Sequence, residues 1–111
     1  MRPVESFMVD EELTPEQALR GKIVSETAQL GWPELMREFA GGRTLWVGPE
    51  LDIIEVAYQL NRDNAPQVAG WIKSEQLRPV SDDEARQWYE GDQTVWASVV
   101  KPWVLVQLPS G

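Results

Sequence analysis

Among the side chains of this protein that can act in catalysis or bind a metal ion, carboxylates are the most abundant. The 111 residues include 18 Asp and Glu against 10 Lys and Arg, and they include neither Cys nor His. This composition excludes thiol nucleophiles, imidazole-based triads, haem ligation and zinc sites with nitrogen or sulfur ligands. General acid–base chemistry by carboxylates remains, as does a Mg²⁺ or Ca²⁺ site with oxygen ligands.

The candidate acidic residues form two groups, each at the predicted start of a helix. They are Asp52 with Glu55, and Asp82 and Asp83 with Glu84. At the start of a helix, acids accept hydrogen bonds from free amides and interact favourably with the helix dipole. Helix capping is therefore the interpretation that we favour for both groups. No calcium-loop spacing supports a metal site, and we predict neither a metal nor a cofactor.

An enzymatic or ligand-binding alternative uses the same acids together with two arginines. It requires an aromatic-lined pocket with convergent polar groups that binds a small molecule. The candidate pocket residues are Asp52, Glu55, Arg62 and Arg86. If these acids lie on convex helix ends instead, this alternative fails.

The six tryptophans are many for a chain that can bury one modest core. A small sheet can hardly cover six indoles, and Trp is enriched at the energetic centres of protein interfaces. We therefore expect one or two tryptophans on a contact surface. Adjacent helical residues point in different directions, so one of Trp88 and Tyr89 is expected to be exposed. The candidate interface residues are Trp46, Trp88, Tyr89, Trp96 and Trp103.

The net charge of −8 argues against several classes of partner. An acidic surface repels phosphate backbones and anionic membranes, so we predict binding to neither nucleic acid nor membrane. The longest apolar stretch, Val95 to Leu108, is interrupted by Lys101 and Pro102 and is shorter than the roughly 20 residues of a membrane helix. The first residues lack the basic and apolar pattern of a secretory signal, which favours a cytoplasmic location.

Local signals predict about five helices and three strand segments. Thr14-Pro15-Glu16-Gln17 is a helix start, and the apolar spacing that follows predicts a helix over 15–29. Further helices are predicted over 33–40, from Asp52 to about Leu60, after Asn64 and after Ser81, each closed by Gly or a turn. Strands are predicted over 43–47, 77–80 and 94–108. The last segment is apolar on both alternating faces, which is typical of a strand covered on both sides, and Pro102 should bend it into two halves.

Together these elements predict a single α+β domain with about five helices packed on a small, mainly antiparallel sheet. We expect a flexible acidic arm over 1–13, the domain over 14–108 and a frayed end over 109–111.

Several segments resemble a family of short, uncharacterised bacterial proteins. The similar segments are 51–57, 81–88 and 100–107, together with Trp32-Pro33-Glu34-Leu35 and Phe39-Ala40-Gly41-Gly42. The resemblance covers roughly 19–107 and excludes the acidic arm. It implies a bacterial origin and one small domain, and it assigns no activity, substrate or catalytic residue.

The leading functional hypothesis is a small cytoplasmic protein that acts by binding, either as a homodimer or other homo-oligomer or as an accessory partner of another protein. The Trp-rich C-terminal strand and the scarcity of catalytic side-chain types support it. The alternatives are the small-ligand or enzymatic pocket described above and an acidic mimic of nucleic acid that sequesters a basic protein.

Overall fold

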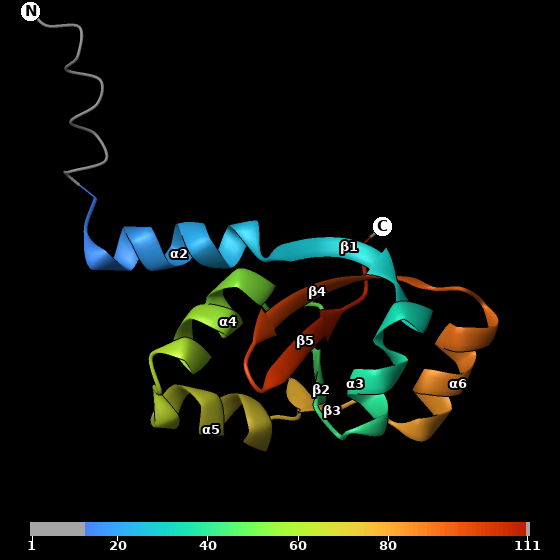
Figure 1. Ribbon diagram of the computed structural model, residues 1–111. Coiled ribbons are helices and arrows are strands. Elements are labelled where there is room, and N and C mark those ends of the chain that lie inside the picture. Colours follow the sequence, from blue (N-terminus) through green and yellow to red (C-terminus); the bar gives the residue numbers. More distant parts are fainter. Residues whose placement is uncertain (1–12, 111) are drawn as a thin grey trace, which may run out of the picture.

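The computed structural model describes residues 13–110 of the chain (Figure 1). Its elements, in chain order, are α2 (Pro15–Ser25), β1 (Thr27–Gly31), the 3-10 turn η2 (Trp32–Leu35), α3 (Met36–Ala40), β2 (Thr44–Val47), α4 (Ile53–Asn61), α5 (Ala65–Lys73), β3 (Leu77–Pro79), α6 (Asp82–Glu90), β4 (Thr94–Val100) and β5 (Trp103–Gln107). The predicted acidic arm lies outside the described residues apart from Leu13.

The strands form one sheet in the order β1-β4-β5-β2-β3. The pairs β1 with β4, β4 with β5, and β2 with β3 are antiparallel, whereas β2 and β5 run parallel. The sheet is therefore mixed and mainly antiparallel, and the α+β class predicted from the sequence is confirmed.

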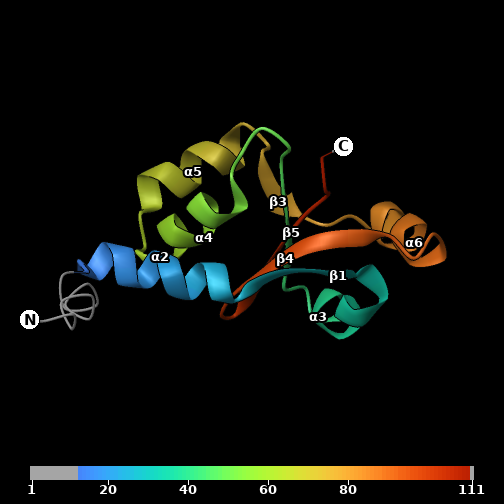
Figure 2. The ribbon, with the colours of Figure 1, turned by 90° about the horizontal axis from the view of Figure 1, so that it is seen from above.

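Helices cover both faces of the sheet, as the view along its edge shows (Figure 2). One buried cluster joins α2 and the α4–α5 pair to the sheet, and it includes Leu105. The other joins η2, α3 and α6 to the opposite face, and it includes Val104 and Val106. Since successive strand residues point to opposite faces, β5 contributes to both clusters. This explains the apolar residues on both faces of the predicted C-terminal strand.

The predicted division of that strand is also confirmed. The chain turns at Lys101 and Pro102, and β4 and β5 pair as an antiparallel hairpin in which Val100 lies opposite Trp103. Proline cannot donate a hydrogen bond to a sheet, which fits its position in the turn rather than within either strand.

The helix predicted over 15–29 is wrong beyond Ser25. The chain leaves the helix there, and residues 27–31 form strand β1 instead, in register with β4. The Thr27 hydroxyl donates to the Ile23 carbonyl at 2.6 Å and is hydrogen-bonded to the Ser98 hydroxyl at 2.7 Å. The helical spacing of apolar residues is thus overridden by pairing with a strand distant in the sequence.

Candidate functional site

The four residues predicted to form a ligand pocket lie in different environments. Asp52 and Arg62 flank the two ends of α4, and the Asp52 carboxylate caps the helix by accepting from the Ile54 amide at 2.9 Å. Arg86 lies on α6, which packs on the other face of the sheet, and pairs with Asp83 at 2.8 Å. The structure therefore does not bring the four side chains together.

Glu55 belongs to a network that fastens α2 to α4. Its carboxylate accepts from Gln59 at 2.7 Å and from Arg20 at 2.8 Å, and these hydrogen bonds hold the pKa of Glu55 below its usual value. The Arg20 guanidinium also lies 3.9 Å from the ring centre of the buried Tyr58, and Arg62 lies 5.4 Å from it. Cation–π contacts of this kind add to the ion pair. Glu55 and Arg62 thus have structural partners.

The second acidic group has the capping role expected from the sequence. The Ser81 hydroxyl accepts from the Glu84 amide, and the Glu84 carboxylate accepts from the Ser81 amide. Glu84 also forms a bidentate ion pair with Arg78, in which both N–O distances are 2.9 Å. This pair is the main cause that lowers the pKa of Glu84 to about 2. The same guanidinium covers the ring of Trp46 at 4.1 Å. In residues 13–110, no group of three acidic side chains is arranged to hold a metal ion.

The six tryptophans divide evenly between interior and periphery. Trp32, Trp71 and Trp88 are buried, whereas Trp46 and Trp96 are half-buried and Trp103 is 36% exposed.

The inclusion of Trp88 among the interface candidates is therefore corrected. Its ring packs edge-on against Trp32 with the ring centres 5.1 Å apart, because α6 turns the side of the helix that carries Ala85 and Trp88 toward the sheet. Tyr89, the next residue, points in a different direction and is 55% exposed. One of these two neighbours is thus exposed, as the sequence predicted.

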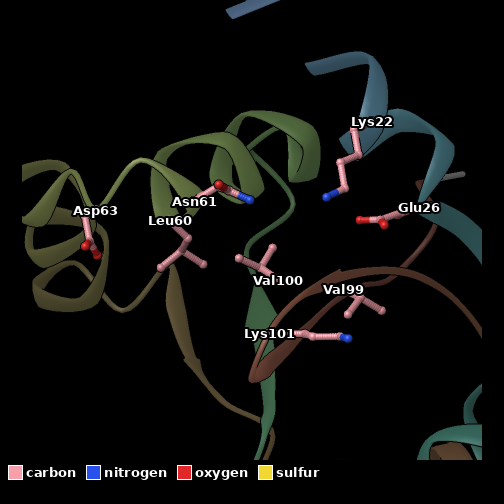
Figure 3. Close-up of a pocket in the computed structure, with 8 residues that line it drawn as sticks. All are labelled: Lys22, Glu26, Leu60, Asn61, Asp63, Val99, Val100 and Lys101. Atoms are coloured by element: carbon pink, nitrogen blue, oxygen red, sulfur yellow. The ribbon is translucent and has the colours of Figure 1, made fainter. Parts of the chain in front are cut away.

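A polar pocket of about 430 Å³ lies between the hairpin turn and the C-terminal ends of α2 and α4 (Figure 3). Its charged side chains are Lys22, Glu26, Asp63 and Lys101, and in Figure 3 the Lys22 amine and the Glu26 carboxylate point toward each other. Two positive and two negative charges balance, so the net charge of the pocket favours neither an anion nor a cation.

The outer edge of β1 is a more specific feature. Within residues 13–110, no strand pairs with this edge, and no helix crosses its ribbon in Figure 2. The Trp32 amide donates to the Gln93 carbonyl at 2.7 Å and therefore faces β4. Because residues of an antiparallel ladder alternate in the side to which their backbone groups point, Thr27, Gln29 and Gly31 direct their amides and carbonyls outward.

The two edges of the sheet differ in how they are protected. The β3 edge is three residues long and includes Arg78 and Pro79, a charge and a proline of the kind that prevent strand addition. The five residues of β1 include neither. The β1 edge is therefore open to pairing with another extended chain.

An apolar groove of about 320 Å³ on one face of the sheet reaches this open edge at Thr27. Trp96 of β4 lies between walls from α2 and α4, which include Val24 and Ile54, and Thr27 of β1 lines it as well. Asp52 lies at the same groove, so the structure brings together one residue of the predicted pocket and one of the predicted interface. Val24 is 56% exposed, which leaves part of this apolar surface uncovered.

Sequence reasoning missed the β1 edge because the segment was assigned to a helix. A signal was present in Thr27-Ala28-Gln29-Leu30-Gly31, where a β-branched residue begins a short uncharged run that ends in glycine. The helical spacing from Leu19 outweighed it.

Comparison with known proteins supports the fold and adds no activity. A family model described as "Protein of unknown function (DUF2288)" matches residues 18–108. The chain is also similar to PA1075 from Pseudomonas aeruginosa, whose structure was solved in solution by NMR, with 40% identity and a TM-score of 0.74 over 90% of this chain and 91% of that one. No curated protein matches the chain. Among the helices of the described residues, none has the length and hydropathy to span a membrane.

Proposed function

We propose that this chain, which belongs to the DUF2288 family of proteins of unknown function, is a non-catalytic binding module that pairs with an extended protein segment along β1. The observation that carries the proposal is the open outer edge of β1 beside the groove of Trp96. Recognition by strand addition uses backbone hydrogen bonds for affinity and adjacent grooves for selectivity. Both requirements are met on one surface.

The positions of the carboxylates support a role in binding rather than catalysis. A general acid or base must reach the substrate with a free oxygen of suitable pKa. Asp52 and Glu84 cap helices, and Glu55 and Glu84 are hydrogen-bonded to arginines. The lowered pKa values of Glu55 and Glu84 favour the ionised form, which serves ion pairing.

Strand addition at this edge leaves the interior of the fold unchanged. Thr27, Gln29 and Gly31 each offer one outward donor and one outward acceptor, which a bound segment can use without displacing β4. Of the predicted interface residues, Trp96 is the one nearest the β1 edge: it pairs with Gln29 and lines the same groove as Thr27. A contact role for Trp103 at the hairpin turn stays a separate prediction, as does a cytoplasmic location.

The proposal is tested with a display library of short random peptides screened against the full chain. We expect enriched peptides to slow hydrogen exchange at the amides of Thr27, Gln29 and Gly31, measured by NMR, because a paired strand protects outward amides. Absence of enrichment, or protection elsewhere on the surface, would contradict the proposal.

A matched pair of variants locates the binding site independently. Gln29→Pro removes an outward amide and retains the hydrogen bonds between β1 and β4, so it should weaken binding by about tenfold or more. Tyr89→Ala alters another exposed residue, on α6, and should leave binding unchanged. Thermal unfolding of both variants checks that the fold is retained. Sedimentation of the wild-type chain and of Gln29→Pro shows whether a second copy occupies the edge.

A further inference from the structure

The two ends of β1 present different chemistry to a bound segment. At its start, Thr27 lies beside the exposed side chain of Val24 in the apolar groove. At its end, a β-carbon placed on Gly31 would lie 3.5 Å from Asp92 Oδ1 and 4.0 Å from Glu34 Oε2. Both acids are exposed, and neither takes part in the ion pairs formed between residues of the described range.

The geometry of strand pairing brings a partner's side chain to these acids. Residues directly opposite each other in a sheet have β-carbons about 4.5–5.5 Å apart and point to the same face. The partner residue opposite Gly31 therefore projects beside the Asp92 and Glu34 carboxylates. Because glycine has no side chain, it leaves that space to the partner. A lysine or arginine there can reach both acids.

The other end of the same segment meets an apolar surface. Thr27 and Gly31 are four residues apart and share a face of β1, since alternate strand residues point the same way. The partner residue opposite Thr27 lies four positions from the one opposite Gly31, next to Val24. An aliphatic side chain there removes apolar surface from water.

A second copy of this chain fits the edge poorly. The antiparallel register that uses all three outward-facing residues centres on Gln29, which puts Thr27 of the second copy opposite Gly31 and supplies no cation. Each chain also has a net charge of −8, which opposes self-association.

We propose that the segment bound along β1 comes from a different, cationic protein and carries a lysine or arginine opposite Gly31 with an aliphatic residue four positions away. This inference rests on the strand-addition function proposed above. The basic residue sets selectivity through its contacts with Glu34 and Asp92. The net negative charge of the chain accelerates encounter with a cationic partner.

The test uses two synthetic peptides that differ at one position. The first is acetyl-Thr-Thr-Lys-Thr-Thr-Thr-Val-Thr-Thr-amide with a fluorescent label, and its twin carries Glu in place of Lys. Fluorescence anisotropy with the full chain measures the Kd of each. We expect the lysine peptide to bind about tenfold tighter at low salt, and the ratio to shrink as salt screens the exposed charges.

Two double variants test which acids are responsible. Glu34→Gln with Asp92→Asn should reduce the preference for lysine to less than about twofold. Glu50→Gln with Asp63→Asn removes the same charge from exposed acids away from β1 and should retain the preference. Asp63 matches Asp92 in having a positive φ, 60° against 50°, and Asn tolerates such a conformation well.

The results of these experiments distinguish the cationic-partner inference from the strand-addition function on which it rests. If the two peptides bind equally, or if the preference survives loss of Glu34 and Asp92, the cationic partner is refuted while strand addition stands. If both library and peptides fail to bind, the proposed function fails with it. If sedimentation shows a dimer that Gln29→Pro dissociates, the edge binds a second copy and the inference is overturned.

Discussion

Replacement of Glu84 by Gln should destabilise the protein by about 1.5 kcal/mol at neutral pH. The pKa of Glu84 falls from 4.5 to about 2, mainly through its hydrogen bonds to Arg78 and partly through those to Ser81, and the whole shift corresponds to about 3 kcal/mol before solvent screening. The side chains of Glu84 and Arg78 remain 25% and 33% exposed, and solvent screening reduces the contribution to about half. Gln retains the oxygen that accepts from the Ser81 amide, so the substitution removes the charge and preserves the cap.

The pH dependence has a definite sign. Well above pH 4.5 the carboxylate is ionised in both the folded and the unfolded chain, and the pair contributes fully to the free energy of unfolding. As the pH falls toward 2, the unfolded chain binds the proton first and the contribution is lost. The difference between wild type and Glu84→Gln should therefore shrink to less than half at pH 3.

Urea unfolding followed by tryptophan fluorescence measures both effects. Glu90→Gln, at the far end of the same helix, is the control, because Glu90 is exposed and belongs to none of the ion pairs between described residues. Its effect should stay within about 0.5 kcal/mol. A loss for Glu84→Gln of similarly small size at pH 7, or one that persists undiminished at pH 3, would refute the role assigned to the ion pair.

Three further predictions concern packing and backbone geometry, and urea unfolding measures each. Trp32→Ala should cost about 3–5 kcal/mol, because the ring is fully buried and its Nε1 donates to the Ala85 carbonyl at 3.0 Å; a loss below about 1 kcal/mol would show that the site collapses around the cavity. Ser81→Ala should cost about 1 kcal/mol through loss of the cap at the start of α6, and an unchanged midpoint would contradict that role. Gly42→Ala and Gly70→Ala should have opposite effects. At Gly42, a φ of 73° makes alanine unfavourable by about 1 kcal/mol. Gly70 lies in α5, and a β-carbon placed on it meets no other atom within 4 Å, so alanine should stabilise the protein by roughly 0.5–1 kcal/mol. Effects of equal sign at the two positions would contradict this prediction.

Helix starts were predictable because capping is settled within a few residues. Thr14 and Ser81 each form the reciprocal capping box that their sequence neighbours indicate. The Asp52 cap is confirmed too, but Glu55 does not complete a box there, because its carboxylate is hydrogen-bonded to Arg20 on another helix. A distant residue thus redirected a side chain whose local role looked clear.

The candidate site was largely beyond prediction because its parts are far apart in the chain. Trp96 and Asp52 were singled out for different reasons, and only the packing of α4 against β4 brings both to one groove. Which member of the pair Trp88 and Tyr89 faces inward also depended on how α6 docks.

The sequence by itself determined the fold class, the helix starts and the burial of the last strand on both faces, because these follow from local hydrogen bonding and from alternation of side chains along a strand. The tertiary structure decided that residues 27–31 form a strand, since β4, some 70 residues away, supplies its hydrogen-bonding partners and the Ser98 hydroxyl bonded to Thr27. It also brought Asp92 to Gly31. Contacts at such separation form only when the whole sheet assembles, and the open edge of β1 exists for the same reason.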